Sequence, residues 1–212
     1  MNDILYLRHT LPIGVRVEEI SGGESYSAKV WNALSRQVYF ENGSDGYRTI
    51  SHFGSGAPCL DDSLSRISLA HTHGMLVVAS LPKTPEADLS VFSPRTAVGV
   101  DVECSGRGQA MKVRDRFLDE SEKSIVSPDS VQENIIAWTA KEAMLKAGMN
   151  ATVDIRKDIV IKKMPVPGGE TGEGVIFVDG VMVPLNLYTY HSGDFTVTVA
   201  YSPKCATFKK KG

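Results

Sequence analysis

The 212-residue sequence has little cysteine, no long apolar run and little net charge, and each shortage argues against a class of protein. Its three cysteines, Cys59, Cys104 and Cys205, are odd in number and widely spaced, which disfavours a disulfide framework or a clustered zinc site. No segment approaches the roughly 18 apolar residues of a membrane span, so we expect no membrane association. A formal charge of -2 provides no broad basic surface, so we expect no nucleic-acid partner.

The composition is that of a globular protein. Hydrophobic residues make up 42% of the chain and charged residues 23%, so the chain can form one compact core or two small lobes. The first residues, MNDILYLRHTLPIG, lack the basic start and apolar run that mark a secretory signal. Together with the scattered thiols, this predicts a cytoplasmic protein.

The N-terminal half contains predicted strands with long connections. LPIGVRVEEI alternates as a strand does, and RISLAHTHGMLVVAS predicts two strands around a turn. Between them, YSAKVWNALSRQVYF has a helical pattern, and HFGSGAPCLDDS has the composition of a loop. The proline-containing LPKTPEADLSVFSPRT then predicts a surface connection.

The C-terminal half predicts helices followed by hairpins. Residues 106–122 suit one short amphipathic helix, and Ser130-x-x-Glu133 is a capping-box pattern before a helix that stops at Gly148. Later segments predict a strand and two hairpins: DIVIKKM, VIFV-DG-VMV and LNLYTY-HSGD-FTVTVAYS. The fold class is therefore α+β, with mainly antiparallel sheets and packed helices.

The segment VGVDVE, residues 98–103, places two carboxylates in a short valine-rich strand. Because side chains alternate along a strand, the three valines share one face, while Gly99, Asp101 and Glu103 share the other. Two like charges about 7 Å apart are unfavourable unless water or a cation compensates them. From this segment alone, an exposed edge strand and a cation site are both open.

The predicted helix before Gly148 presents Trp138, Glu142 and Lys146 on one face, because they recur every four residues. A separate alanine-rich stripe suits packing against a sheet. Alone, Glu142 and Lys146 are also compatible with a weak surface ion pair. Lys141 lies at the flank, where it could reach a phosphate or be solvated.

VGVDVE, followed about 35 residues later by WTAKEAMLK, resembles the paired signature of the 4'-phosphopantetheinyl transferases. That signature joins a G-x-D-x-E strand to a W-x-x-K-E-x-x-x-K helix. The likeness extends to GAPCL, LAHTHG and RFLDESE, and runs from about His52 to Pro203.

In length, the chain resembles members of the longer branch of that family. That branch activates surfactin-type synthetases, and its members are built from two similar α/β lobes in a pseudo-dimer. A weak internal echo between HGMLVVAS and SGDFTVTVAYS agrees with duplicated lobes. We therefore expect an N-terminal lobe over residues 1–97, on the nucleotide side, and a C-terminal lobe over residues 98–212 that carries the metal and catalytic motifs.

The resemblance implies Mg²⁺-dependent transfer of the 4'-phosphopantetheine arm of coenzyme A to a serine of an apo carrier protein, with release of adenosine 3',5'-bisphosphate. By matching position, Asp101, Glu103 and Glu142 would bind magnesium. Glu142 would also activate the serine hydroxyl, directly or through water, and Lys146 would contact phosphate and protonate the leaving group.

The same resemblance implies cofactor contacts at His71, Lys141 and Lys146, with His71 on the nucleotide 3'-phosphate. The partners would be coenzyme A and an apo acyl or peptidyl carrier protein, and the protein would be a monomer with pseudo-twofold lobes. Two alternatives stay open: a Mg²⁺-dependent nuclease or phosphodiesterase, and a catalytically inactive carrier-binding relative.

The sequence departs from the family pattern at three positions. Ala57 stands where many members have lysine, and Ala70 and Thr72 stand where serines are usual. These positions bear on the affinity for coenzyme A and leave the acidic motif intact.

Overall fold

The computed structural model describes residues 5–12, 15–21, 37–39, 47–52, 58–60, 66–81, 98–148, 153–178, 180–202 and 209–210. These residues form an α+β fold in which every strand pairing is antiparallel. The predicted fold class is confirmed at this level.

The N-terminal part forms a four-stranded sheet and a small three-stranded sheet. In order across the larger sheet, the strands are β1 (Leu5–Thr10), β2 (Arg16–Ser21), β7 (Met75–Leu81) and β6 (Arg66–Thr72). The smaller sheet contains β3 (Gln37–Tyr39), β4 (Tyr47–His52) and β5 (Pro58–Leu60). The predicted hairpin of β6 and β7 is confirmed, with Gly74 at φ +91° in its turn.

Two segments in this part differ from their predicted structure. Residues 37–39, expected at the end of a helix, form β3 instead, because they pair with Tyr47–Thr49. Residues 58–60, expected in a loop, form β5, which pairs with β4. The remaining residues of the predicted helix, at 26–36 and 40, and the connection at 82–96 lie outside the described residues.

The C-terminal part forms a six-stranded sheet. Its strands in order are β8 (Val98–Cys104), β12 (Phe195–Tyr201), β11 (Val181–Ser192), β10 (Gly172–Val178) and β9 (Ile159–Lys163), and β13 (Lys209–Lys210) also pairs with β11. Gly180 and Gly193 have positive φ in the two hairpin turns that the sequence predicts. Both hairpins are therefore confirmed.

The helices are α2 (Gln109–Phe117), α3 (Glu120–Lys123) and α4 (Val131–Gly148). The single helix expected over residues 106–122 is wrong. Leu118 is extended, and Asp119 begins α3 through a full capping box with Glu122, which ends one helix and starts the next. Among the described residues, no helix is long and apolar enough to cross a membrane.

The start of α4 follows the prediction in part. The Glu133 backbone N–H donates to Ser130 Oγ at 3.2 Å, as a capping box requires. The Glu133 carboxylate instead accepts from the Ser127 backbone N–H at 2.7 Å. It therefore ties the preceding loop to the helix rather than completing the box.

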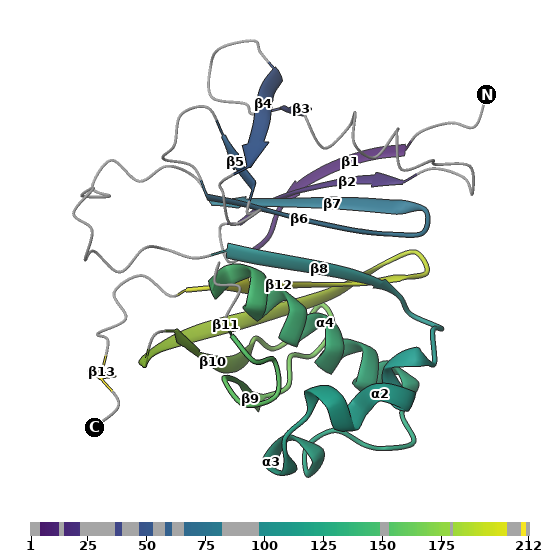
Figure 1. Ribbon diagram of the computed structural model, residues 1–212. Helices are drawn as coiled ribbons and strands as arrows, with labels where there is room; N and C mark the ends of the chain where they lie inside the picture. The colour runs from purple at the N-terminus through teal and green to yellow at the C-terminus, as the bar shows by residue number, and fades with distance from the viewer. Residues whose placement is uncertain are drawn as a thin grey trace.

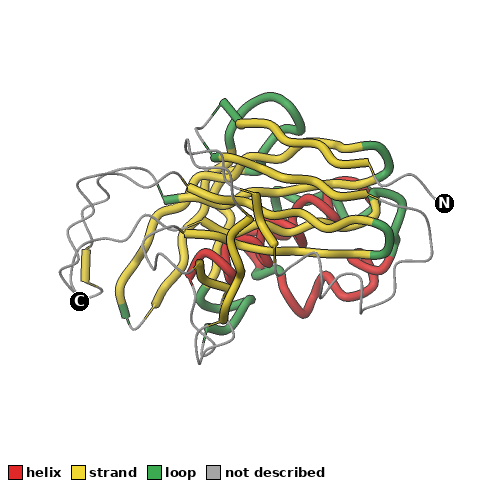
Figure 2. The backbone as a smooth tube through the Cα atoms, turned by 90° about the horizontal axis from the view of Figure 1, so that it is seen from above, coloured by secondary structure: helices red, strands yellow, loops and turns green. Residues whose placement is uncertain are grey.

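The elements form three layers (Figure 1). The N-terminal sheet packs on one face of the C-terminal sheet, and α4 packs on the other. Figure 2, which looks down on the N-terminal sheet, shows the helices behind the strands. Apolar residues fill both interfaces, with Val17, Val77 and Ala79 facing Val100 and Val199 between the sheets.

A polar cluster also joins the two sheets. The Glu19 carboxylate on β2 is 2% exposed and accepts hydrogen bonds from Tyr190 Oη and Ser192 Oγ on β11, each at 2.6 Å. Burial and the neighbouring Glu19 charge raise the pKa of the Tyr190 phenol, so it remains a donor.

Candidate functional site

Strand β8 separates its apolar and acidic residues onto different faces, as the alternation predicts. Val98, Val100 and Val102 are buried against the N-terminal sheet. The Val100 backbone N–H also donates to Ser68 Oγ on β6 at 3.0 Å, which fixes β8 beside that sheet. The opposite face of β8, with Asp101, lies against α4.

Gly99 allows α4 to approach β8 closely. A Cβ atom at Gly99 would overlap the carbonyl oxygen of Ala143 and lie 2.5 Å from the backbone nitrogen of Ala147. Only a residue without a side chain fits this contact. The glycine of the acidic strand therefore determines how near the Glu142-bearing helix can come to the acids.

Asp101 and Lys146 form an ion pair across this contact. Lys146 Nζ lies 2.6 Å from Asp101 Oδ1. Asp101 is only 8% exposed, and burial raises the pKa of its carboxyl to about 6, although Lys146 opposes this shift. The weak intrahelical Glu142–Lys146 pair that the sequence allowed is replaced by this pair between elements.

Glu103 has a different basic partner. Arg107 Nη1 lies 3.2 Å from Glu103 Oε2, with the Glu103 side chain 22% exposed and the Arg107 side chain 58% exposed. Arg107 was not predicted as a site residue, because it follows the strand in the turn SGRG, where no regular period indicates which side chains meet.

Glu142 is half-buried on α4 and interacts electrostatically with Glu103 and Asp101. Burial raises the pKa of its carboxyl, Lys146 lowers it and Glu103 raises it. In turn, Glu142 and Glu103 both raise the pKa of Asp101. The three predicted acids are thus brought into one electrostatically coupled site, in which like charges oppose full ionisation.

The donor chemistry of these acids fits Mg²⁺, which prefers carboxylate oxygens and retains water ligands. The pKa values of Asp101 and Glu142 are raised first by burial and then by neighbouring acids, and a bound cation would offset both effects. The side chains are not arranged as a complete set of metal ligands. In the described part of the chain, no three acidic, histidine or cysteine side chains are grouped to hold a metal. Asp101 and Glu103 instead contact Lys146 and Arg107.

Lys141 lies outside this site, which corrects its expected cofactor contact. Its side chain is fully buried, with Nζ 2.7 Å from Glu122 Oε2. The ammonium group also donates to the carbonyl oxygens of Ile159 and Ile155, at 2.5 and 3.1 Å. A phosphate could reach Lys141 only by breaking this buried set, so its role is structural.

Glu122 completes that buried cluster. Its carboxylate accepts from the backbone N–H groups of Ile161 and Asp119, at 2.7 and 2.8 Å, as well as from Lys141. The cluster therefore joins α3, α4 and β9. The spacing Asp119-x-x-Glu122 is a capping-box signal that could have identified Glu122 from the sequence.

His71 lies on β6, the strand that contacts β8 through Ser68. Its side chain is exposed near the β6–β7 turn. Figure 1 shows this turn and the C-terminal end of β8 at the same side of the molecule. The fold thus places His71 at the end of the interface where Glu103 lies.

A pocket of about 210 Å³ adjoins the acids through Glu103. Its lining residues are Glu103, Arg107, Gln109, Ala110, Val113, Ile135 and Trp138. Trp138 also packs edge-on against Phe117, with ring centroids 5.1 Å apart, so it braces α4 against α2 and forms a pocket wall. The pocket therefore lies where α2 packs against α4.

Comparison with known proteins agrees with this geometry. Residues 97–174 match the family model of the 4'-phosphopantetheinyl transferase superfamily. The matched segment begins just before β8 and ends within β10, so it contains both the acidic strand and α4. No curated protein matches the chain. The family match supports phosphopantetheine transfer as the general activity and does not favour the nuclease or inactive-relative alternatives.

Proposed function

We propose that the protein transfers the 4'-phosphopantetheine arm of coenzyme A to a serine of an apo acyl or peptidyl carrier protein, using Mg²⁺. The observation that carries the proposal is the packing of the Asp101 and Glu103 strand against the helix of Glu142 and Lys146, within the matched segment. Two elements far apart in sequence meet at the residues that the paired motif specifies.

Glu142 is suited to accept the proton of the carrier serine. Its half-buried position and raised pKa make it a better general base than an exposed carboxylate, because base strength increases with pKa. As this proton leaves, the serine oxygen bonds to the phosphorus that carries the pantetheine arm. The bond between this phosphorus and the oxygen that bridges the two phosphates of coenzyme A breaks, and adenosine 3',5'-bisphosphate departs with that oxygen.

Lys146 is suited to stabilise that departing phosphate. Its ammonium group is next to Asp101 but remains 31% exposed, so it can contact a bound phosphate from the same position. A positive charge at this point is most valuable when the leaving oxygen gains negative charge. Asp101, Glu103 and Glu142 would hold Mg²⁺, which supplies charge neutralisation and orientation of the phosphates when bound.

The N-terminal sheet is suited to bind the nucleotide part of coenzyme A, with His71 on its 3'-phosphate. The strand orders support two related lobes, residues 1–97 and 98–212. The order β2–β7–β6 in one sheet parallels β8–β12–β11 in the other, and in both a hairpin pairs through its second strand with an earlier strand. This supports the longer, pseudo-dimeric branch and a monomeric protein.

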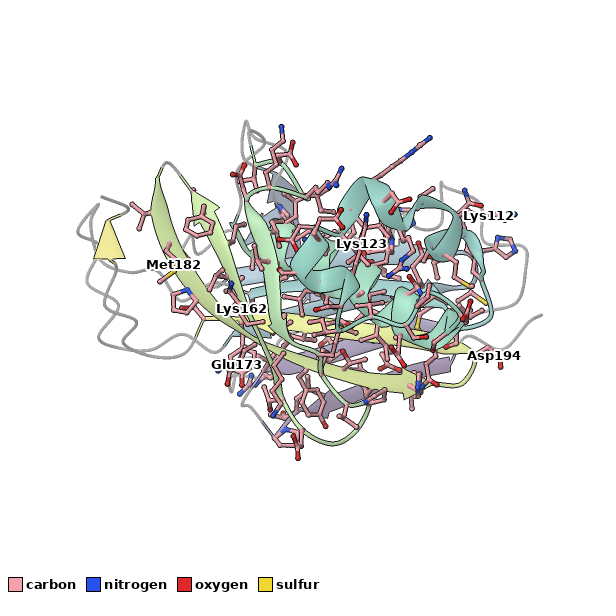
Figure 3. The ribbon with its side chains drawn as sticks, turned by 90° about the horizontal axis from the view of Figure 1, so that it is seen from below. Lys112, Lys123, Lys162, Glu173, Met182 and Asp194 are labelled. Atoms are coloured by element: carbon pink, nitrogen blue, oxygen red, sulfur yellow. The ribbon has the colours of Figure 1, made fainter. Side chains whose placement is uncertain are left out.

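The test is a mass-shift assay with purified protein, coenzyme A, Mg²⁺ and apo carrier proteins from fatty acid, polyketide and peptide synthases. We expect the mass of at least one carrier to increase by one phosphopantetheine arm. Glu142→Gln should abolish the increase. Glu173→Gln is the matched control, because Glu173 is exposed on β10, three strands from β8, at the end of the molecule opposite Lys112 and Asp194 (Figure 3).

No mass increase across the carrier panel would contradict the proposal. Hydrolysis of DNA or RNA by the same preparation with Mg²⁺ would instead revive the nuclease alternative.

A further inference from the structure

Two acids of the proposed site each form an ion pair with a different basic side chain. Asp101 pairs with Lys146 from α4, and Glu103 pairs with Arg107 from the connection between β8 and α2. The matching motif accounts for Lys146. Arg107 lies outside that motif, and its guanidinium group contacts one of the three proposed magnesium ligands directly.

The position of Arg107 follows from the fold. The Arg107 backbone N–H donates to the Cys104 carbonyl at 3.1 Å, which closes a turn after β8. Within that turn, the Ser105 backbone N–H donates to the Asp194 carbonyl at 2.7 Å, and Ser105 Oγ lies 2.8 Å from Thr196 Oγ1. The turn is thus fixed to the β11–β12 hairpin, which presents Arg107 beside Glu103.

The Glu103–Arg107 pair also forms the polar rim of the pocket. Both side chains line it together with Gln109, and its other walls are apolar. The greater exposure of Arg107, 58% against 22% for Glu103, leaves the guanidinium group room to move into solvent without leaving a buried charge unpaired. Lys146 is less exposed and pairs with the more buried acid.

We propose that Arg107 competes with the divalent cation for the Glu103 carboxylate and so sets the affinity of the site for that cation. This inference rests on the proposed function, because it assumes that Glu103 is a metal ligand. Glu103 Oε2 accepts from Arg107 Nη1, so a cation that uses this oxygen replaces that hydrogen bond and must overcome repulsion from the guanidinium charge. Arg107 is therefore an affinity-determining residue rather than a catalytic one.

The test is titration of the full-length protein with Mg²⁺, and separately with Mn²⁺, by isothermal calorimetry. Arg107→Gln removes the competing charge and should tighten cation binding by about two- to fivefold, the range expected for an exposed ion pair. Arg107→Lys should remain within about twofold of wild type, because it keeps the charge. Lys112→Gln removes the same charge from an exposed position on α2 and is the matched control.

A double-mutant cycle separates the local contact from the general field of the protein. In a Glu103→Gln background, Arg107→Gln should no longer tighten binding. An equal effect of Arg107→Gln and Lys112→Gln would overturn the inference, as would an effect that persists without Glu103.

The failure of the inference can be distinguished from failure of the proposed function. If wild type binds the cation and modifies a carrier, but Arg107→Gln leaves the affinity unchanged, the Arg107 inference alone is wrong. If wild type neither binds a divalent cation nor modifies any carrier, both are wrong.

Discussion

Gly99 on β8 lies directly against the backbone of Ala143 on α4, so closely that any side chain at position 99 would overlap the Ala143 carbonyl oxygen. This contact joins the strand that carries Asp101 to the helix that carries Glu142. The glycine of the acidic motif is therefore a packing requirement, because it allows the acids of two elements to share one site.

Gly99→Ala should separate β8 from α4. We expect a loss of about 1–3 kcal/mol in the free energy of unfolding from overpacking. We also expect a loss of transferase activity on the order of 100-fold, because displacement of catalytic groups by about 1 Å has that effect. Urea denaturation and the carrier mass-shift assay measure the two changes.

Gly106→Ala is the control for that substitution, because a Cβ at Gly106 would meet no atom within 4 Å. Equal effects of the two substitutions on activity would contradict a role for close strand–helix packing.

Asp101 should reduce stability at neutral pH. Burial raises its folded-state pKa to about 6 from an ordinary value of 3.8, so the folded protein binds this proton more tightly than the unfolded chain does. The resulting stabilisation is fully present below pH 3.8 and is lost as pH rises through about 6. Asp101→Asn, which stays neutral, should therefore be more stable than wild type by about 3 kcal/mol at pH 7.5.

The measurement is urea denaturation from pH 4 to pH 8 with a chelator present, so that bound cations do not contribute. The stability difference between Asp101→Asn and wild type should shrink toward pH 4. A difference that is constant with pH would show that it does not come from ionisation of Asp101.

The buried Lys141–Glu122 pair should contribute to folding rather than to coenzyme A binding. Lys141→Met should lower the free energy of unfolding by about 3–5 kcal/mol, because it leaves Glu122 as a buried charge without its cation. Adding Glu122→Gln should restore part of that loss. Chemical denaturation of the single and double variants measures both effects.

Titration with coenzyme A tests whether Lys141 lies outside the cofactor site. At a temperature where Lys141→Met is folded, its Kd for coenzyme A should stay close to that of wild type, whereas Lys146→Met should bind more weakly. If coenzyme A binding weakened equally in the two variants, Lys141 would be a cofactor-binding residue after all.

The contact between Tyr190 and Glu19 should hold the two sheets together. Tyr190→Phe removes a donor from a buried carboxylate, and a hydrogen bond to a charged group contributes about 1.5–3 kcal/mol to stability. Thermal and urea denaturation should show this loss. Tyr188→Phe, on the same face of β11, should change stability by less than about 0.5 kcal/mol; a similar loss there would point to ring packing instead.

The sequence by itself determined the local features of the site. Alternation put the acids of VGVDVE on one face, and the helical period put Glu142 and Lys146 on one side of α4, because both patterns depend only on backbone geometry. The hairpins around Gly180 and Gly193 were predictable for the same reason. The break between α2 and α3 was missed because the capping side chains of Asp119 and Glu122 overrode a continuous amphipathic pattern.

Only the tertiary structure decided which charged side chains meet. Lys141 and Glu142 are neighbours in sequence, yet one is fully buried with Glu122 and the other adjoins the acids of β8, because successive helical residues point about 100° apart. Lys146 pairs with Asp101, 45 residues away, and Arg107 reaches Glu103 through a turn fixed by the β11–β12 hairpin. These pairings depend on contacts between distant segments, which local periodicity does not encode.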